Sequence, residues 1–241
     1  MSKPVLGIIG GGQLGSMLVT AAKKIGIKTV IFCDDQDAPA QNFSDKFICG
    51  KYDDQNIIDE FINAIDIATF EFENIPYETL NKINNIKSVL PNPSINKIVQ
   101  NRLFEKDYIN KLNIRTTQYV SIKNEEEIYI NKDFLPGLLK TTILGYDGKG
   151  QYKINLVDDL KNLNIDFTKE YILEKLVKLK KEISVIITRF GNKKYAIYDP
   201  IENVHEDQIL KHSKIPADIN ENILEESKKW SKMIAEELKY I

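Results

Sequence analysis

The chain has 241 residues, of which 42 % are hydrophobic, so it is long enough for one large or two modest domains with a buried core. Its 33 Lys and Arg residues nearly balance its 35 Asp and Glu residues. This balance argues against a dedicated nucleic-acid-binding protein and against a polybasic membrane-surface protein. No run approaches the roughly 18 apolar residues of a membrane span, and the N-terminal apolar stretch is too short for a signal peptide. We therefore expect a cytoplasmic protein that binds neither nucleic acid nor membrane.

The first hundred residues predict an α/β domain with a parallel sheet. Short apolar runs alternate with segments of helical spacing, a pattern typical of strands joined by crossover helices. The predicted strands are residues 4–9, 28–32, 47–49, 65–72 and 88–90, and the predicted helices are residues 13–24, 55–64 and 77–86. We place this Rossmann-like domain at residues 1–100.

The pattern changes after a long helix predicted over residues 94–112. Short strands surround a glycine-rich loop, which predicts a small α+β unit with a hairpin flap. The predicted strands are residues 118–121, 137–140, 151–154, 171–173 and an antiparallel pair at 182–189 and 193–198, and an amphipathic helix follows at 219–238. We place the linking helix and flap domain at residues 101–174 and a third domain at residues 175–241.

Gly10, Gly12 and Gly15 form a G-x-G-x-x-G pattern between the first predicted strand and helix. Backbone N–H groups at such a turn bind phosphate with help from the helix dipole. Asp34 and Asp35 follow the second strand and could bind a ribose. At this point an NAD-dependent oxidoreductase, another nucleotide-binding protein and a purely structural turn all remain open.

Lys140 ends an apolar strand, and residues 145–151 form a glycine-rich loop that could fold over a polyphosphate. An ordinary hairpin tip is the alternative, although it does not explain the lysine before the loop. By spacing alone, Glu174 and Glu182 belong to a solvated face. Glu71 and Glu73 alternate onto one face at the end of a strand, where paired acids could bind hydroxyls or an amine. Two isolated histidines, with no cysteine near them, predict no metal site.

Four motifs in this order resemble the N5-carboxyaminoimidazole ribonucleotide synthases, the ATPase subunits of phosphoribosylaminoimidazole carboxylase in the ATP-grasp superfamily. They are Gly10-Gly-Gly-Gln-Leu-Gly15, Thr69-Phe-Glu-Phe-Glu-Asn-Ile-Pro76, Gln100-Asn-Arg-x-x-x-Lys106 and Gly145-Tyr-Asp-Gly-Lys-Gly-Gln151. The resemblance implies an ATP-grasp architecture: a Rossmann-like pre-ATP-grasp domain, a small α+β flap domain and an incomplete C-terminal antiparallel α+β domain.

The resemblance implies a ligase. Such enzymes use ATP and bicarbonate to convert 5-aminoimidazole ribonucleotide into N5-carboxyaminoimidazole ribonucleotide in de novo purine biosynthesis, by way of carboxyphosphate. A closed flap would keep water from the mixed anhydride before the amine attacks. The resemblance further implies a homodimer whose product passes to the carboxyaminoimidazole ribonucleotide mutase.

Residue by residue, the resemblance implies two binding sites and a reacting centre. The ATP side comprises Arg102, Lys140, the loop Gly145, Tyr146, Asp147, Gly148, Lys149, Gly150 and Gln151, the hinge Glu174, Lys175, Leu176 and Val177, and then Glu182 and His205. The ribonucleotide side comprises Gly12, Gln13, Leu14, Gly15 and Glu73, with the glycine loop holding the substrate phosphate. Tyr146 and Asp147 would face the reacting centre as the catalytic residues.

The sequence ends at Ile241, before the strands in which such enzymes carry their acidic Mg²⁺ ligands and a bicarbonate-binding segment. No metal ligand is therefore expected within these 241 residues. Without divalent ligands a triphosphate lacks its usual charge neutralisation. We expect these residues by themselves to be weakly active or inactive, with a non-catalytic nucleotide-binding fragment as the alternative.

Overall fold

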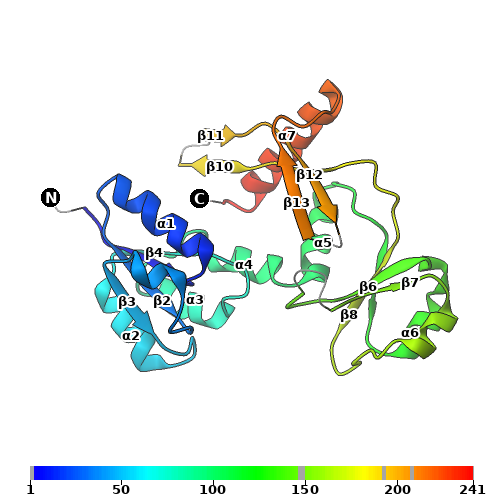
Figure 1. The fold of residues 1–241 in the computed structure, drawn as a ribbon, viewed down its shortest axis with the longest axis horizontal. Helices are drawn as coiled ribbons and strands as arrows, with labels where there is room; N and C mark the ends of the chain where they lie inside the picture. Colours follow the sequence, from blue (N-terminus) through cyan, green and yellow to red (C-terminus); the bar gives the residue numbers. More distant parts are fainter. Residues whose placement is uncertain (1–2, 146–149, 192–193, 207–208, 241) are drawn as a thin grey trace. The chain divides into compact units, whose positions relative to one another are not determined.

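The computed structural model describes residues 3–145, 150–191, 194–206 and 209–240. It divides into two compact units, Met1–Val99 and Gln100–Tyr240 (Figure 1). In the described residues, no helix is both long enough and apolar enough to cross a membrane.

The first unit is built on a four-stranded parallel sheet in the order β3-β2-β1-β4, which confirms the predicted α/β architecture. Its strands are β1 Leu6–Ile9, β2 Thr29–Cys33, β3 Lys46–Cys49 and β4 Ile67–Phe70. Its helices are α1 Gln13–Lys24, α2 Gln55–Ala64, α3 Tyr77–Asn84 and α4 Pro93–Val99, with a short 3-10 helix, η1, at Pro39–Asn42. The predicted strand at residues 88–90 is reduced to one bridge between Val89 and Ala68.

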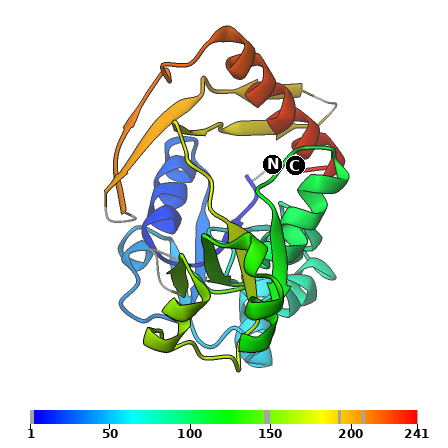
Figure 2. The same cartoon turned by 90° about the vertical axis from the view of Figure 1, so that its right-hand side faces the viewer.

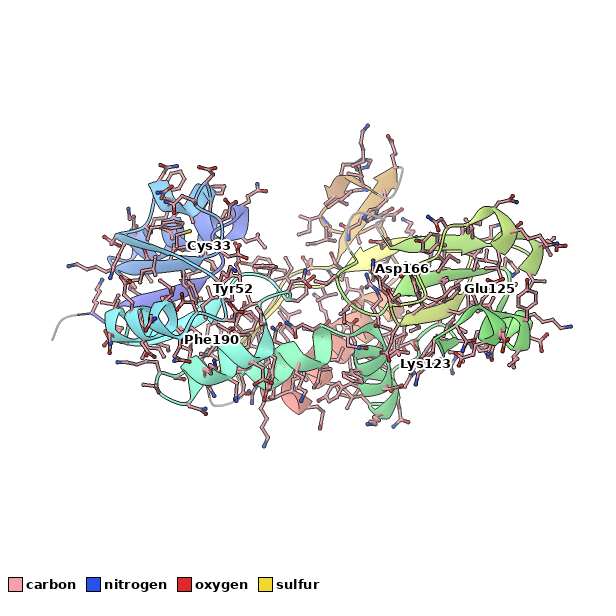
Figure 3. The ribbon with its side chains drawn as sticks, turned by 90° about the horizontal axis from the view of Figure 1, so that it is seen from below. Cys33, Tyr52, Lys123, Glu125, Asp166 and Phe190 are labelled. Carbon is pink, nitrogen blue, oxygen red and sulfur yellow. The ribbon has the colours of Figure 1, made fainter. Side chains whose placement is uncertain are left out.

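Apolar side chains cover both faces of this sheet, so it has two cores. Ile8 and Ile31 face the core that contains Val19 of α1, whereas Ile9 and Phe32 face the core of α2 and α3. Tyr52, labelled with Cys33 in Figure 3, packs its ring edge-on against Phe32 with the centroids 5.2 Å apart. This two-sided burial explains why β1 and β2 are continuous apolar runs rather than alternating ones.

The prediction of a single helix over residues 94–112 is wrong, because the structure has two helices there. α4 ends at Val99, and α5 spans Arg102–Lys111. Between them Asn101 adopts an extended backbone, and its side-chain oxygen accepts hydrogen bonds from Leu103 N at 2.9 Å and Phe104 N at 3.3 Å. Asn101 is thus an N-cap that starts a new helix.

The second unit begins with α5 and an antiparallel sheet in the order β5-β8-β6-β7. Its elements are β5 Tyr119–Ile122, α6 Glu125–Ile130, η2 Lys132–Phe134, β6 Gly137–Thr141, β7 Gln151–Ile154, η3 Val157–Asn162 and β8 Tyr171–Lys175. Figure 3 labels Lys123 and Glu125 at the start of α6. The sheet packs on a core of fully buried side chains that includes Ile122, Leu139 and Leu173.

The rest of the second unit contains two further sheets and a long helix. Its elements are β9 Glu182–Ser184, β10 Ile187–Phe190, β11 Lys194–Ile197, β12 Ile201–Glu206, β13 Ile209–Lys214 and α7 Glu221–Glu237. The strand predicted at residues 182–189 is divided, because β9 pairs with β12 whereas β10 pairs with β11. α7, the red helix in Figure 2, packs against β10.

Candidate functional site

Two lysines share one carboxylate in the second unit. Lys140 lies on β6, and its Nζ is 2.8 Å from Oε2 of Glu174 on the neighbouring strand β8. Lys106 lies on α5, and its Nζ is 3.1 Å from the other oxygen, Oε1. We call these three residues the lysine cluster. It carries a net positive charge, which suits an anionic ligand.

The lysine cluster is partly sheltered from solvent. The Glu174 side chain is 9 % exposed, and those of Lys106 and Lys140 are 18 % and 23 % exposed. Burial alone would raise the pKa of Glu174, but the hydrogen bond and charge of Lys140 and the charge of Lys106 outweigh it and lower that pKa. The carboxylate is therefore ionised at neutral pH and holds both ammonium groups in place.

Arg102 connects the start of α5 to the strand that carries Lys140. Its Nε donates to the carbonyl of Thr141 at 3.1 Å, its Nη2 to the carbonyl of Gly145 at 2.8 Å, and its backbone N–H to the carbonyl of Thr142 at 2.9 Å. Arg102 and Lys106 are four residues apart on α5 and therefore share a helix face. The guanidinium thus holds the N-terminal side of the glycine-rich loop beside the lysine cluster.

The other side of this loop is held by Gly150. Its carbonyl accepts from Thr141 N at 2.9 Å, its φ is +69°, and a Cβ there would lie 2.8 Å from Thr141 Oγ1. Glycine is therefore required. Gln151 follows on β7 and pairs in register with Lys140. The predicted loop residues Tyr146, Asp147, Gly148 and Lys149 lie outside the described residues.

The predicted hinge follows directly from β8. Lys175 N donates to Gln118 O at 2.9 Å and Leu176 N donates to Pro136 O at 2.9 Å, so these two N–H groups already have protein partners. The side chains of Leu176 and Val177 are 38 % and 53 % exposed. They leave an apolar surface against which a planar ring could pack.

Glu182 and His205, both expected at a nucleotide site, come together on neighbouring strands. Oε2 of Glu182 on β9 is 3.5 Å from Nδ1 of His205 on β12. They line a cavity of about 270 Å³ with Leu179, Lys181, Glu202 and Asn203. Spacing alone did not predict this contact, because β12 had not been expected.

In the first unit, the glycine loop contacts Glu71 of the loop after β4. Oε1 of Glu71 accepts from Gly12 N at 2.7 Å, and Oε2 accepts from Gly15 N. The predicted residues Gln13 and Leu14 are exposed at the start of α1, and Glu73 is exposed two residues after Glu71. The alternation of Glu71 with Glu73 indicated a pair of acids, but only Glu73 was expected on the ribonucleotide side.

Comparisons with known proteins identify the parts of the chain. Residues 2–100 match the ribonucleotide synthetase preATP-grasp domain, and residues 107–241 match the ATP-grasp domain. A crystal structure of an N5-carboxyaminoimidazole ribonucleotide synthetase in complex with ADP has a TM-score of 0.92 and 34 % identity, and the match covers 99 % of this chain and 64 % of that one. The synthetase of Staphylococcus aureus complexed with ADP has a TM-score of 0.90 and 33 % identity, and the match covers 97 % and 63 % of the two chains.

The fold is thus that of an ATP-grasp protein. A curated relative from Brucella melitensis, an N5-carboxyaminoimidazole ribonucleotide synthase, is 36 % identical over 98 % of this chain and 67 % of its own length. The relative from Staphylococcus aureus strain COL is 34 % identical over 89 % of this chain and 58 % of its own length. The chain belongs to the N5-carboxyaminoimidazole ribonucleotide synthase family, and it spans roughly three fifths to two thirds of the length of these relatives. The comparisons support neither the oxidoreductase nor the non-catalytic fragment as alternatives.

Proposed function

We propose that this protein takes part in the ATP-dependent carboxylation of 5-aminoimidazole ribonucleotide by bicarbonate, through carboxyphosphate, to N5-carboxyaminoimidazole ribonucleotide in de novo purine biosynthesis. Family membership supports the reaction. The observation that carries the proposal is the lysine cluster, in which Glu174 holds two ammonium groups beside a loop anchored by Arg102. Such a cluster suits the triphosphate that an ATP-dependent ligase must bind.

In this proposal the second unit binds ATP. Lys140 and Lys106 neutralise phosphate charge, Arg102 positions the loop Gly145–Gln151 over the phosphates, and Glu174–Val177 hold the adenine. Glu182 and His205 bind the ribose end of the nucleotide. Because Lys175 N and Leu176 N already have partners, the adenine would be held by the remaining polar groups of the hinge and by its apolar side chains. The flap spans residues 101–174, and residues 175–241 belong to the C-terminal ATP-grasp domain.

The first unit, in the same proposal, binds the ribonucleotide through the loop Gly12–Gly15 and through Glu73. Tyr146 and Asp147 face the reacting centre. A cytoplasmic location, a homodimer and transfer of the product to a mutase complete the proposal, and they are based on the resemblance to the family.

Magnesium ions accompany ATP in this class of reaction. Across residues 3–145, 150–191, 194–206 and 209–240 no three His, Cys, Asp or Glu side chains gather in a way that could hold a metal. We assign no step to the ion.

Titration calorimetry on the 241-residue protein tests the proposal. We expect ATP to bind and Lys140→Ala to weaken that binding at least tenfold. The control Lys161→Ala should leave it within twofold, because Lys161 is an exposed lysine paired with Asp158. ADP release that requires both bicarbonate and the ribonucleotide would support the full reaction. Stabilisation by NADH, with none by ATP or by the ribonucleotide, would refute the proposal.

A further inference from the structure

The side chain of Glu71 occupies the part of the glycine loop that in other proteins binds a ligand anion. Its two carboxylate oxygens accept hydrogen bonds from the N–H groups of Gly12 and Gly15, at the start of α1. Its own backbone N–H donates to Ile9 O at 3.0 Å, which continues the parallel pairing of β1 with β4. The carboxylate is therefore placed by the sheet and is half-buried against the loop.

This carboxylate lies close to all three glycines of the G-x-G-x-x-G pattern. A Cβ on Gly10, whose φ is +102°, would lie 2.3 Å from Cγ of Glu71. A Cβ on Gly12 would lie 3.0 Å from Oε1, and one on Gly15 would lie 3.0 Å from Oε2 and 2.8 Å from Gly10 O. Larger residues would clash with Glu71 or, at Gly15, with the backbone of Gly10, so the pattern is explained without a bound phosphate.

An anion at these N–H groups is stabilised by the hydrogen bonds and by the helix dipole, and Glu71 already receives both. A phosphate placed on the same two N–H groups would have to displace the carboxylate or lie against a second negative charge. A carboxylate has about four acceptor positions, and the N–H groups of the loop use two of them. The Glu71 carboxylate can therefore still accept hydrogen bonds from hydroxyl or amine donors.

We propose that Glu71 is a positioning residue: it acts as the built-in anion of the glycine loop, fixes the loop backbone and excludes phosphate from the N–H groups of Gly12 and Gly15. The ligand then approaches this part of the loop with hydroxyl or amine donors rather than with its phosphate. This revises the expectation that these N–H groups hold a substrate phosphate. That the ligand is a ribonucleotide rests on the proposed function, whereas the exclusion of phosphate does not.

Amide NMR of the 241-residue protein during titration with inorganic phosphate tests the exclusion directly. In the wild type we expect the Gly12 and Gly15 resonances to stay in place up to tens of millimolar phosphate. In Glu71→Ala, which vacates the anion position, we expect both to shift and saturate. The control Glu78→Ala removes an exposed glutamate of the same unit and should behave as the wild type. Saturable shifts in the wild type would overturn the proposal.

Glu71→Gln keeps the size of the side chain but removes its charge, and it also places an N–H₂ group against one of the loop donors. We expect the Gly12 and Gly15 amide protons to move upfield as the charge-assisted bonds are lost. If both resonances remain where they are in the wild type, the carboxylate does not bond to them and the proposal fails, whatever Glu71→Ala does.

Ligand affinity tests the positioning role. We expect Glu71→Gln to weaken binding of 5-aminoimidazole ribonucleotide at least tenfold, Glu71→Asp to restore part of the loss, and both to leave ATP affinity within twofold. A general loss of structure would weaken both ligands. A wild type that does not bind the ribonucleotide refutes the proposed function, whereas equal ribonucleotide binding by the wild type and Glu71→Gln refutes the positioning role.

Discussion

Glu174→Gln is expected to lower the free energy of unfolding of the second unit by about 3 kcal/mol. The carboxylate lies 2.8 Å and 3.1 Å from two ammonium groups, which at an effective dielectric constant of 20 corresponds to a gross attraction of about 5–6 kcal/mol each. Desolvation offsets much of this attraction. Replacing the carboxylate by an amide leaves two like charges facing each other. We expect a loss at the low end of the ~3–5 kcal/mol for a broken buried pair, because the lysines keep some solvent contact.

Urea unfolding followed by the fluorescence of Trp230, the single tryptophan of the chain and part of α7, provides the assay. The matched control is Glu206→Gln, which breaks an ion pair to Lys211 of 3.0 Å whose side chains are 62 % and 61 % exposed. Exposed pairs contribute about 0–1 kcal/mol, so the control should lose little. Equal losses for Glu174→Gln and the control would refute the reasoning that burial makes the lysine cluster strong.

Three further predictions concern the second unit. The lysines lower the pKa of Glu174 below its ordinary value of 4.5. The stability advantage of the wild type over Glu174→Gln, measured by urea midpoints, should therefore be complete at pH 7 and shrink as the pH falls below 4.5. An advantage that grows on acidification would contradict this. Asn101→Ala should cost about 1 kcal/mol in urea unfolding because α5 loses its cap, and Asn101→Asp should cost less. Leu173→Ala, at a fully buried position, should cost about 2–5 kcal/mol by the same measurement, and a loss below that range would mean the core there collapses into the space.

The sequence predicts the bounds of α1 and α2 well because local chemistry marks their ends. Three glycines precede α1, and Asp54 caps α2 by accepting from Asn56 N and Ile57 N. The break at Asn101 is different, because the apolar spacing continues across it. A tertiary contact favours the break: the backbone N–H of Arg102 donates a hydrogen bond to the carbonyl oxygen of Thr142, forty residues further along the chain. A local pattern does not contain that contact.

The strands β12 and β13 were missed for a related reason. Every residue of β13 is exposed, so the strand has no apolar face and no alternation to detect. Without β12, the meeting of Glu182 with His205 could not be inferred, and Glu182 was assigned to a solvated face by spacing. Only part of the lysine cluster was predicted. Lys140 was chosen because it precedes the glycine-rich loop, whereas Lys106 reaches Glu174 because α5 lies beside β8.

The glycine fingerprint shows what such a motif does and does not specify. Glycines at these positions mean that something approaches the backbone closely, and they do not say whether it is a ligand or another part of the chain. In this fold the parallel register pairs Ile9 with Phe70, so the residue after β4 must lie beside Gly10. An acidic residue there, Glu71, can reach the loop N–H groups, whereas an apolar residue would leave them for a phosphate. In this chain, the residue at that one position, 61 residues beyond Gly10, is therefore what closes the loop internally.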